Sequence, residues 1–545
     1  MTTPALDPSA TLARGGVQTI RRIITYLLFA LMVGISASGL SGLLERLFTL
    51  NRVGVSFDNE GLATSLAFAL IAGPLAALLW FLIWRDAASA RDRASVAWPV
   101  YLVVASTAAL LTSTTTLFSW ASDVIARGWE PFGLAVGVVW GLVWAWHYWM
   151  WHHPRKGPTR LQGAAPAIAS FIGLALGTGG FVWALGRLID SAVETVSGTV
   201  LVSDPVWQVV LQPLVWAVGG SLLWWWHWFR VGVRTHSFGF STVLLVFAAG
   251  VASLAAFALG LTIALSVVLE LLTGVAQPLA ELLDPLGIAL ASAVIGALVY
   301  AYHARVVAAG PTGLRAATRL ASSGVSLALA ASGVGVTINA LLATSSNAII
   351  EGNIRSLLLG GLSALLVGGV LWWLIWRPQD ASTPERLATP GRRIYLVIIF
   401  GVSALVALIT LLVIGFQLFS FLLDGGSGES FVERSRQALG LLTATVLVAA
   451  YHFAIWRKDR TGDVAAEPAR RIGRVTLVAS GHDAELVAAV RAATGAKVIV
   501  LQRAEAVLRE PDVTTVLSAL EAIEAPHVLV VAGAKGKVAV IPLTS

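Results

Sequence analysis

The sequence predicts an all-α polytopic membrane protein of about twelve transmembrane helices in six parallel two-helix repeats, followed by a small C-terminal cytoplasmic α/β (βαβαββ) domain. Three observations predict this class. Hydrophobic residues make up 57% of the 545 residues and charged residues only 12%, a composition that requires lipid around most of the chain. Apolar runs of about 20 residues or more, the length that crosses the hydrocarbon core, recur along the sequence. Alternate runs end in the same aromatic and basic signature.

The apolar runs are separated by short polar segments, and each is long enough to cross a bilayer as a helix. We expect spans near 22–48, 63–84, 98–121, 132–152, 165–189, 206–229, 240–271, 286–305, 321–345, 356–376, 393–423 and 434–456. The first run is longer than the core of a signal peptide, so we expect it to remain as the first span.

Every second span ends in aromatic residues, with Arg or Lys within a few positions. The copies are Trp80 to Arg85, Trp144 to His147, Trp224 to Trp228, Tyr300 to His303, Trp372 to Arg377 and Tyr451 to Arg457. They lie 63 to 80 residues apart, so the repeating unit is a helix pair. We predict a cytoplasmic tail at 1–20, repeats at 21–97, 98–160, 161–235, 236–310, 311–391 and 392–460, a linker at 461–471 and the cytoplasmic domain at 472–545.

Acidic residues before proline mark where second helices begin, because a carboxylate caps free N–H groups and proline fits the first helical position. The copies are Glu130-Pro131, Asp204-Pro205 and Asp284-Pro285, and Ser430 to Glu433 forms a capping box. Glycines inside the spans predict close approach of neighbouring helices, as at Gly137, Gly141, Gly360, Gly361, Gly368 and Gly369.

The charges of the short loops predict the orientation. The N-terminus and the loops between repeats carry 21 Lys and Arg against 6 acids, whereas the loops within repeats carry 7 Arg against 15 acids. We expect the protein in the inner (plasma) membrane. The positive-inside rule then places both termini in the cytoplasm. Fourteen of the 21 Trp lie at the cytoplasmic ends of second helices, where we expect an aromatic belt.

The hydrophobic period changes after residue 471. Strands are expected at 475–479, 497–501, 528–531 and 538–541, and helices at 483–494 and 514–523. Ser480, Gly481 and His482 lie between the first strand and helix, where backbone N–H groups could hold an anion or other ligand. A simple N-cap turn is the alternative, because the motif lacks the spacing of known phosphate loops.

Four histidines occupy nearly corresponding positions in four repeats: His147, His227, His303 and His452. Histidines on separate transmembrane helices can ligate haem or another macrocycle, which makes these the candidate cofactor-binding residues. Their position in the aromatic belt favours the alternative, in which they anchor the helices at the membrane interface.

No other constellation predicts chemistry. The chain has no cysteine, which excludes disulfides and thiolate sites, and no Ser/His/Asp set or metal-ligand spacing occurs. Thr112 to Thr116, Asn339 and Gln417 lie deep in first helices and are interpreted as helix-joining groups, while Arg187 and Asp190 are expected to pair with each other. We therefore expect no enzyme, no catalytic residues, no metal and no cofactor.

The last repeat opens with Arg392-Arg393-Ile-Tyr395-Leu and closes with Tyr451-His452-Phe-Ala-Ile-Trp456-Arg457. In these motifs it resembles an uncharacterised bacterial family of tandem two-helix membrane domains, and Arg21-Arg22-Ile-Ile-Thr-Tyr26-Leu repeats the opening less closely. The resemblance extends over about 450 residues. It implies architecture only, because no activity is assigned to that family.

Three functions compete. A non-enzymatic scaffold or sensor fits the scarcity of buried charge together with a folded tail that meets a cytoplasmic protein or small ligand. A small-solute transporter or channel fits the number of spans, although parallel repeats differ from the inverted repeats typical of transporters. A haem- or pigment-binding electron carrier would use the four histidines. The lipid bilayer is an expected partner, and nucleic acid is not, because the basic residues are dispersed.

Overall fold

The computed structural model describes residues 8–50, 59–89, 93–197, 205–235, 239–274, 278–344, 351–380, 390–426, 429–466, 472–479, 484–502, 512–521, 523, 525–532 and 538–543. The chain divides into two compact units. The first is Met1–Asp380 with Leu405–Val446, and the second is Ala381–Ala404 with Leu447–Ser545.

Long helices form most of the described residues up to Ala466, because the apolar runs satisfy their backbone hydrogen bonds internally. They are α1 (Pro8–Thr49), α2 (Asn59–Ala67), η1 (Phe68–Ala72), α3 (Gly73–Asp86), α5 (Ala97–Arg127), α6 (Pro131–His152), α7 (Ala164–Ser197), α8 (Val206–Trp225), η2 (Trp226–Arg230), η3 (Val233–Thr235), α9 (Gly239–Phe247), η4 (Ala248–Ala252), α10 (Ser253–Thr273), α11 (Leu279–Leu283), α12 (Leu286–Ala308), α13 (Thr312–Ala343), α14 (Glu351–Asp380), α16 (Pro390–Leu423) and α17 (Phe431–Ala466). The segments η1, η2 and η4 are single π-helical turns: η1 joins α2 to α3, η4 joins α9 to α10, and η2 extends α8 to Arg230.

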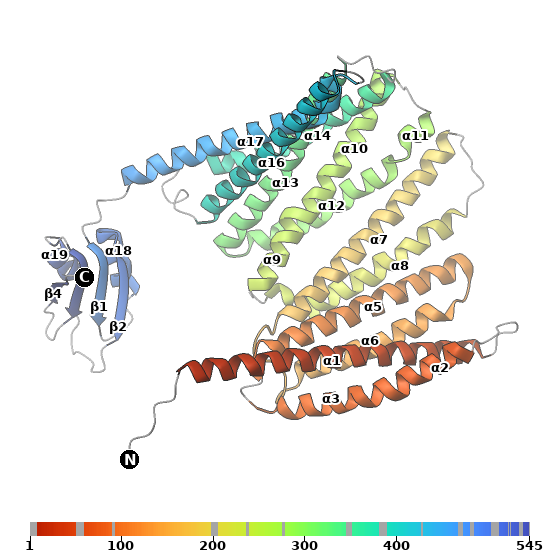
Figure 1. Ribbon diagram of the computed structural model, residues 1–545, viewed down its shortest axis with the longest axis horizontal. Helices are drawn as coiled ribbons and strands as arrows, with labels where there is room; N and C mark the ends of the chain where they lie inside the picture. Colours follow the sequence, from red (N-terminus) through yellow and green to blue (C-terminus); the bar gives the residue numbers. More distant parts are fainter. Residues whose placement is uncertain are drawn as a thin grey trace. The chain divides into compact units, whose positions relative to one another are not determined.

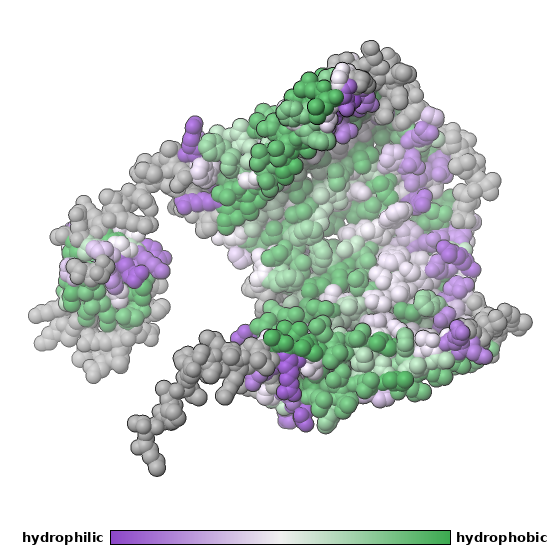
Figure 2. All heavy atoms as spheres, viewed as in Figure 1, coloured by the Kyte–Doolittle hydropathy of each residue, from purple (hydrophilic) through white to green (hydrophobic). Residues whose placement is uncertain are grey.

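Within the described residues, eleven helices are long and apolar enough to cross a membrane, by length and composition. The span expected at 132–152 corresponds to α6, a 22-residue helix that is not among these eleven. Its Trp and His residues, as in the run from Trp144 to His153, lower its mean hydropathy. Figure 2 shows hydrophobic surface along the middle of the visible helices and hydrophilic residues gathered at their ends.

Two helices extend beyond their predicted spans. Helix α1 begins at Pro8, inside the segment predicted as an N-terminal tail, and α17 continues to Ala466, inside the predicted linker. Proline suits a first helical position, and no further proline interrupts the chain between residues 431 and 466. Local helix propensity therefore carries both helices beyond their apolar segments.

The helices of the first unit pack in a regular order. Extensive contacts join α5 to α6, α7 to α8, α10 to α12 and α13 to α14. Four first helices also pack on a second helix from the following pair: α1 on α6, α5 on α8, α7 on α12 and α10 on α14. Figure 1 shows the successive helix pairs of the first unit side by side, with α6 between α1 and α5.

Glycines permit the closest of these approaches. A Cβ atom on Gly361 or Gly368 of α14 would meet backbone atoms of α13, at Thr337 and Ala330, and one on Gly137 of α6 would meet the Leu117 side chain. Gly360 and Gly369 have no such neighbour within 4 Å, so only one glycine of each predicted pair lies at the contact.

The second helices begin where predicted, but their predicted caps are largely wrong. Helix α6 starts at Pro131 without a side-chain bond from Glu130. The N-cap residue of α12 is Pro285, and Asp190 of α7 accepts a hydrogen bond from the backbone N–H of Gly287. Ser430 does cap α17, since its hydroxyl lies 3.2 Å from the N–H of Glu433. Asp204 lies outside the described residues.

The C-terminal domain has the predicted βαβαββ order: β1 (Ile472–Ala479), α18 (Ala484–Thr494), β2 (Lys497–Gln502), α19 (Val513–Leu520), β3 (Ala525–Ala532) and β4 (Val538–Leu543). The strand order is β2-β1-β3-β4, with β1 parallel to β2 and β3, and β4 antiparallel to β3. Its own core includes Val475, Val490, Val516, Val528 and Val530, all fully buried.

Candidate functional site

The four predicted histidines share one local geometry. His147 lies in α6, His227 in η2, His303 in α12 and His452 in α17. Each Nδ1 lies 2.8 to 2.9 Å from the carbonyl oxygen four residues earlier. A carbonyl only accepts, so Nδ1 carries the proton, and in the neutral ring Nε2 is left as an acceptor.

Burial contradicts the anchor interpretation of these residues. The exposed fractions are 1% for His147, 2% for His227, 2% for His303 and 0% for His452. An interfacial anchor presents its ring to the lipid headgroups, whereas these rings point between helices. Hydropathy could not show this, because it does not report which face of a helix meets protein.

His147 has a defined partner for its second nitrogen. The hydroxyl of Tyr101 on α5 lies 2.9 Å from Nε2 of His147, and both side chains are buried. In the second unit the rings of Tyr395 and His452 are in contact with centroids 6.0 Å apart, but Nε2 of His452 has no hydrogen-bond partner among the described residues. Sequence reasoning missed Tyr101 as a site residue. The signal was the dipeptide Tyr-Leu near the start of a first helix, which recurs at Tyr26, Tyr101 and Tyr395.

His227 and His303 lie among aromatic rings of neighbouring helices. Trp144 of α6 contacts His227 with ring centroids 6.5 Å apart, and Trp228 of η2 contacts His303 at 5.8 Å. The indole N–H of Trp228 donates to the Tyr302 hydroxyl at 2.7 Å, which links η2 to α12. The aromatic endings of successive helix pairs thus form a continuous packed layer.

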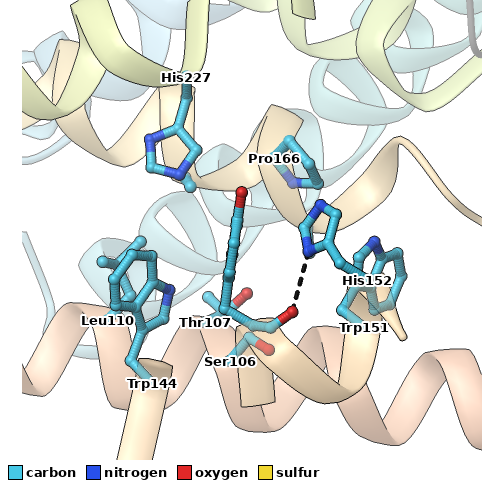
Figure 3. A pocket seen from close by; sticks show the side chains of 11 residues that line it. Ser106, Thr107, Leu110, Trp144, Trp151, His152, Pro166 and His227 are labelled. Atoms are coloured by element: carbon cyan, nitrogen blue, oxygen red, sulfur yellow. Dashed lines mark hydrogen bonds between the residues drawn. The ribbon is translucent and has the colours of Figure 1, made fainter. Parts of the chain in front are cut away.

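A small cavity of about 20 Å³ opens beside His227. Ser106, Trp144, Tyr148 and His152 also line it, and Figure 3 shows His227 and Trp144 on one side of the space and His152 on another. Within the described residues, the Ser106 hydroxyl is buried without a hydrogen-bond partner. The volume fits about one water molecule, which is too small for a macrocycle.

Two of the other polar candidates, Asn339 and Asp190, join helices. Arg436 of α17 donates to Asn339 of α13 at 2.9 Å and to Glu433 at 2.8 Å. Asp190 bonds to α12, while Arg187 lies over the Trp183 ring at 5.8 Å.

The threonines at 114, 115 and 116 donate to backbone carbonyls of their own helix. The Gln417 Oε1 atom is buried without a partner among the described residues. Ser480, Gly481 and His482 lie outside the described residues. No group of three or more His, Asp or Glu within the described ranges has the geometry to hold a metal ion.

Comparison with known proteins gives one match. A family described as a domain of unknown function (DUF5671) matches residues 22–131 and 317–450, just under half of the chain. No curated protein and no solved structure matches. The expected resemblance to an uncharacterised family with repeated domains is confirmed to this extent, over fewer residues than expected. The chain is thus similar, in two separate segments of its helical region, to a domain whose function is unknown.

Proposed function

We propose that the chain is an integral protein of a bacterial inner membrane that acts as a non-enzymatic scaffold or sensor. In this proposal α6 is the twelfth span, six parallel helix pairs cross the membrane, and both termini are cytoplasmic. The α/β domain recognises a cytoplasmic protein or a small ligand.

One observation carries the proposal: polar side chains in the helices bond to neighbouring helix pairs. Gln208 of α8 donates to the carbonyls of Ile125 and Ala126 at the end of α5, at 3.0 and 2.8 Å. Arg355 of α14 donates to the carbonyl of Gly274 after α10. Asp190 and Arg436 bond across two further junctions. Because these polar groups hold helices together, they favour a fixed helical array rather than a solute pathway.

The tail supports a recognition role. Its core is built from its own strands and helices, so its fold does not depend on the membrane helices. In the β1–β3 register, Val478 lies opposite Val531, so the carboxyl ends of the two parallel strands lie next to each other. Ligands of open α/β sheets bind beyond the carboxyl ends of such strands.

The test compares the full chain with a chain that ends at Ala466, both expressed at equal membrane levels in the native host. In-cell crosslinking should yield defined cytoplasmic partners for the full chain, and these should disappear with the truncation. Proteoliposomes of either chain should show no solute flux above protein-free vesicles.

Substrate-specific flux that survives the truncation would instead establish the transporter. A visible absorption band in purified protein, lost in His227→Ala but retained in His152→Ala, would establish the pigment-binding alternative.

A further inference from the structure

A basic pocket lies between α1 and α3, away from the histidines. It has a volume of about 430 Å³, and Arg21, Arg22 and Arg85 line it together with Asp86. Three guanidinium groups against one carboxylate leave a local excess of positive charge. Figure 2 shows hydrophilic residues where the described side chains of α1 begin and α3 ends, beside the hydrophobic surface of the same helices.

The contact between Asp86 and Arg85 in this pocket is exposed to solvent. Asp86 lies 3.5 Å from its neighbour Arg85, and both side chains are more than half exposed, so water weakens their attraction. The related opening motif of α16 provides a contrast. There, Arg392 meets Asp459 of α17 at 2.9 Å, with exposed fractions of only 6% and 15%. In that case a buried acid satisfies the arginine directly.

The remaining walls suit an amphipathic ligand. Leu79, Leu82 and Ile83 form an apolar side, while Thr25 and Trp98 add a hydroxyl and an aromatic ring. Guanidinium groups match phosphate oxygens in a planar, bidentate fashion, and basic pockets between membrane helices bind phosphate-bearing headgroups. The pocket therefore combines a charged mouth with an apolar wall on the same two helices.

A second pocket repeats this chemistry at α13. It has a volume of about 310 Å³, with Arg315, Arg319, Thr318 and Tyr300 as polar lining and Leu374 and Ile375 of α14 as apolar lining. The two pockets lie at the starts of the two segments that match the uncharacterised family. Recurrence at corresponding places is an independent observation in favour of a shared ligand.

We propose that both pockets bind a phosphate group, carried by the headgroup of an anionic lipid or supplied as free phosphate. The guanidinium groups hold the phosphate oxygens, and in the lipid case the apolar wall contacts the glycerol and upper acyl chain. The site is separate from the tail and from the buried histidines, so the proposal stands apart from the scaffold function.

The test uses the full chain in detergent, delipidated and then incubated with phosphatidylglycerol or phosphatidylcholine, with retained lipid counted by native mass spectrometry. Phosphatidylglycerol should be retained and phosphatidylcholine lost. Arg21→Gln with Arg22→Gln and Arg85→Gln, or Arg315→Gln with Arg319→Gln, should weaken retention by roughly fivefold per arginine removed. The matched control, Arg127→Gln at the exposed end of α5, should retain lipid as the natural chain does.

Arg→Lys changes at the same positions keep the charge but lose the bidentate geometry, so retention should fall between that of the natural chain and that of the glutamine variants. This intermediate retention separates lost binding from misfolding. If millimolar inorganic phosphate displaces the retained lipid, free phosphate is the ligand. If phosphate does not displace the lipid, the lipid headgroup is the ligand. Equal retention of both lipids, or glutamine variants that bind like the control without phosphate competition, would overturn the proposal.

Discussion

The hydroxyl of Tyr101 on α5 donates a hydrogen bond to Nε2 of His147 on α6 at 2.9 Å, while Nδ1 of the same ring donates to the carbonyl of Val143 at 2.8 Å. Both nitrogens of a buried imidazole are therefore satisfied, and one neutral tautomer is fixed. The hydrogen bond joins α5 to α6, and its two residues lie 46 positions apart in the sequence. We therefore expect this hydrogen bond to contribute measurably to the stability of the helical region.

Replacing Tyr101 with phenylalanine should destabilise the helical region. The change leaves Nε2 of His147 buried without its donor, at a cost of about 1–3 kcal/mol. Thermal unfolding of the purified protein should therefore shift to lower temperature. Tyr148→Phe is the matched control, because its hydroxyl makes no hydrogen bond among the described residues. Equal shifts for the two variants would contradict a role for the hydrogen bond.

Adjacent glycines of α14 should respond oppositely to alanine. A Cβ atom at Gly368 overlaps the backbone of α13 at Ala330, so Gly368→Ala should cost about 1–3 kcal/mol through forced separation of the helices. Gly369 has open space, so Gly369→Ala should be neutral or stabilise the helix by up to about 1 kcal/mol. The midpoint of thermal unfolding measures both, and a similar loss in the two variants would disprove the close α13–α14 contact.

Breaking the buried ion pair of Arg392 and Asp459 should have a large effect. Asp459→Asn leaves a guanidinium only 6% exposed without its carboxylate, at a cost of roughly 3–5 kcal/mol. The exposed pair of Arg127 and Asp123, 3.9 Å apart, serves as the control, and Asp123→Asn should change stability by less than about 0.5 kcal/mol. Thermal unfolding of the full chain distinguishes the two. Comparable small effects would show that the α16–α17 pair is not held by this contact.

The C-terminal domain should lose stability in acid through Asp512, the N-cap of α19. Hydrogen bonds from the hydroxyls of Thr515 and Thr514 and from the Thr515 N–H lower the pKa of the Asp512 carboxyl. The folded-state pKa then lies below the unfolded value of about 3.9. The contribution is present above that value and is lost as the pH falls through the folded-state pKa.

Hydrogen exchange of the α19 amides in the full chain measures this effect. Asp512→Asn keeps a capping side chain without a charge, so exchange in the variant should vary less with pH over the acidic range. An identical pH dependence in both proteins would rule out the carboxylate as the origin.

The absence of natural cysteine permits a direct test of orientation, because a single introduced thiol is the only one in the chain. Asn59→Cys lies at the first residue of α2, beside the loop within the first predicted repeat. Its thiol should react with a membrane-impermeant maleimide in intact cells. Thr312→Cys lies at the start of α13, between repeats, and should react only after permeabilisation. Labelling of Thr312→Cys in intact cells would invert the proposed topology.

The long helices could be predicted from the sequence because hydropathy and helix-end chemistry are local. The span expected at 98–121 is α5 at Ala97–Arg127, and the strand expected at 497–501 is β2 at Lys497–Gln502. Alternation of apolar and polar residues determines such elements before any tertiary contact forms.

The site could not be predicted in the same way. Asp190 bonds to Gly287 only because α7 packs on α12 of the following helix pair, and the sequence suggested the nearer Arg187 instead. The burial of the histidines depends on which face each helix turns toward its neighbours. Such facts arise from packing between segments that lie far apart in the chain.

The packing of each helix pair on the next has a consequence for the evolution of such chains. At four successive junctions the first helix of one pair meets the second helix of the following pair, so the same kind of interface recurs along the row. Stability then approximates a sum of contributions from pairs and from nearest-neighbour interfaces. Gene duplication or loss can add or remove one pair without creating a new type of contact. Array length is therefore an evolvable quantity, and homologues that carry the same α/β domain on longer or shorter rows are expected.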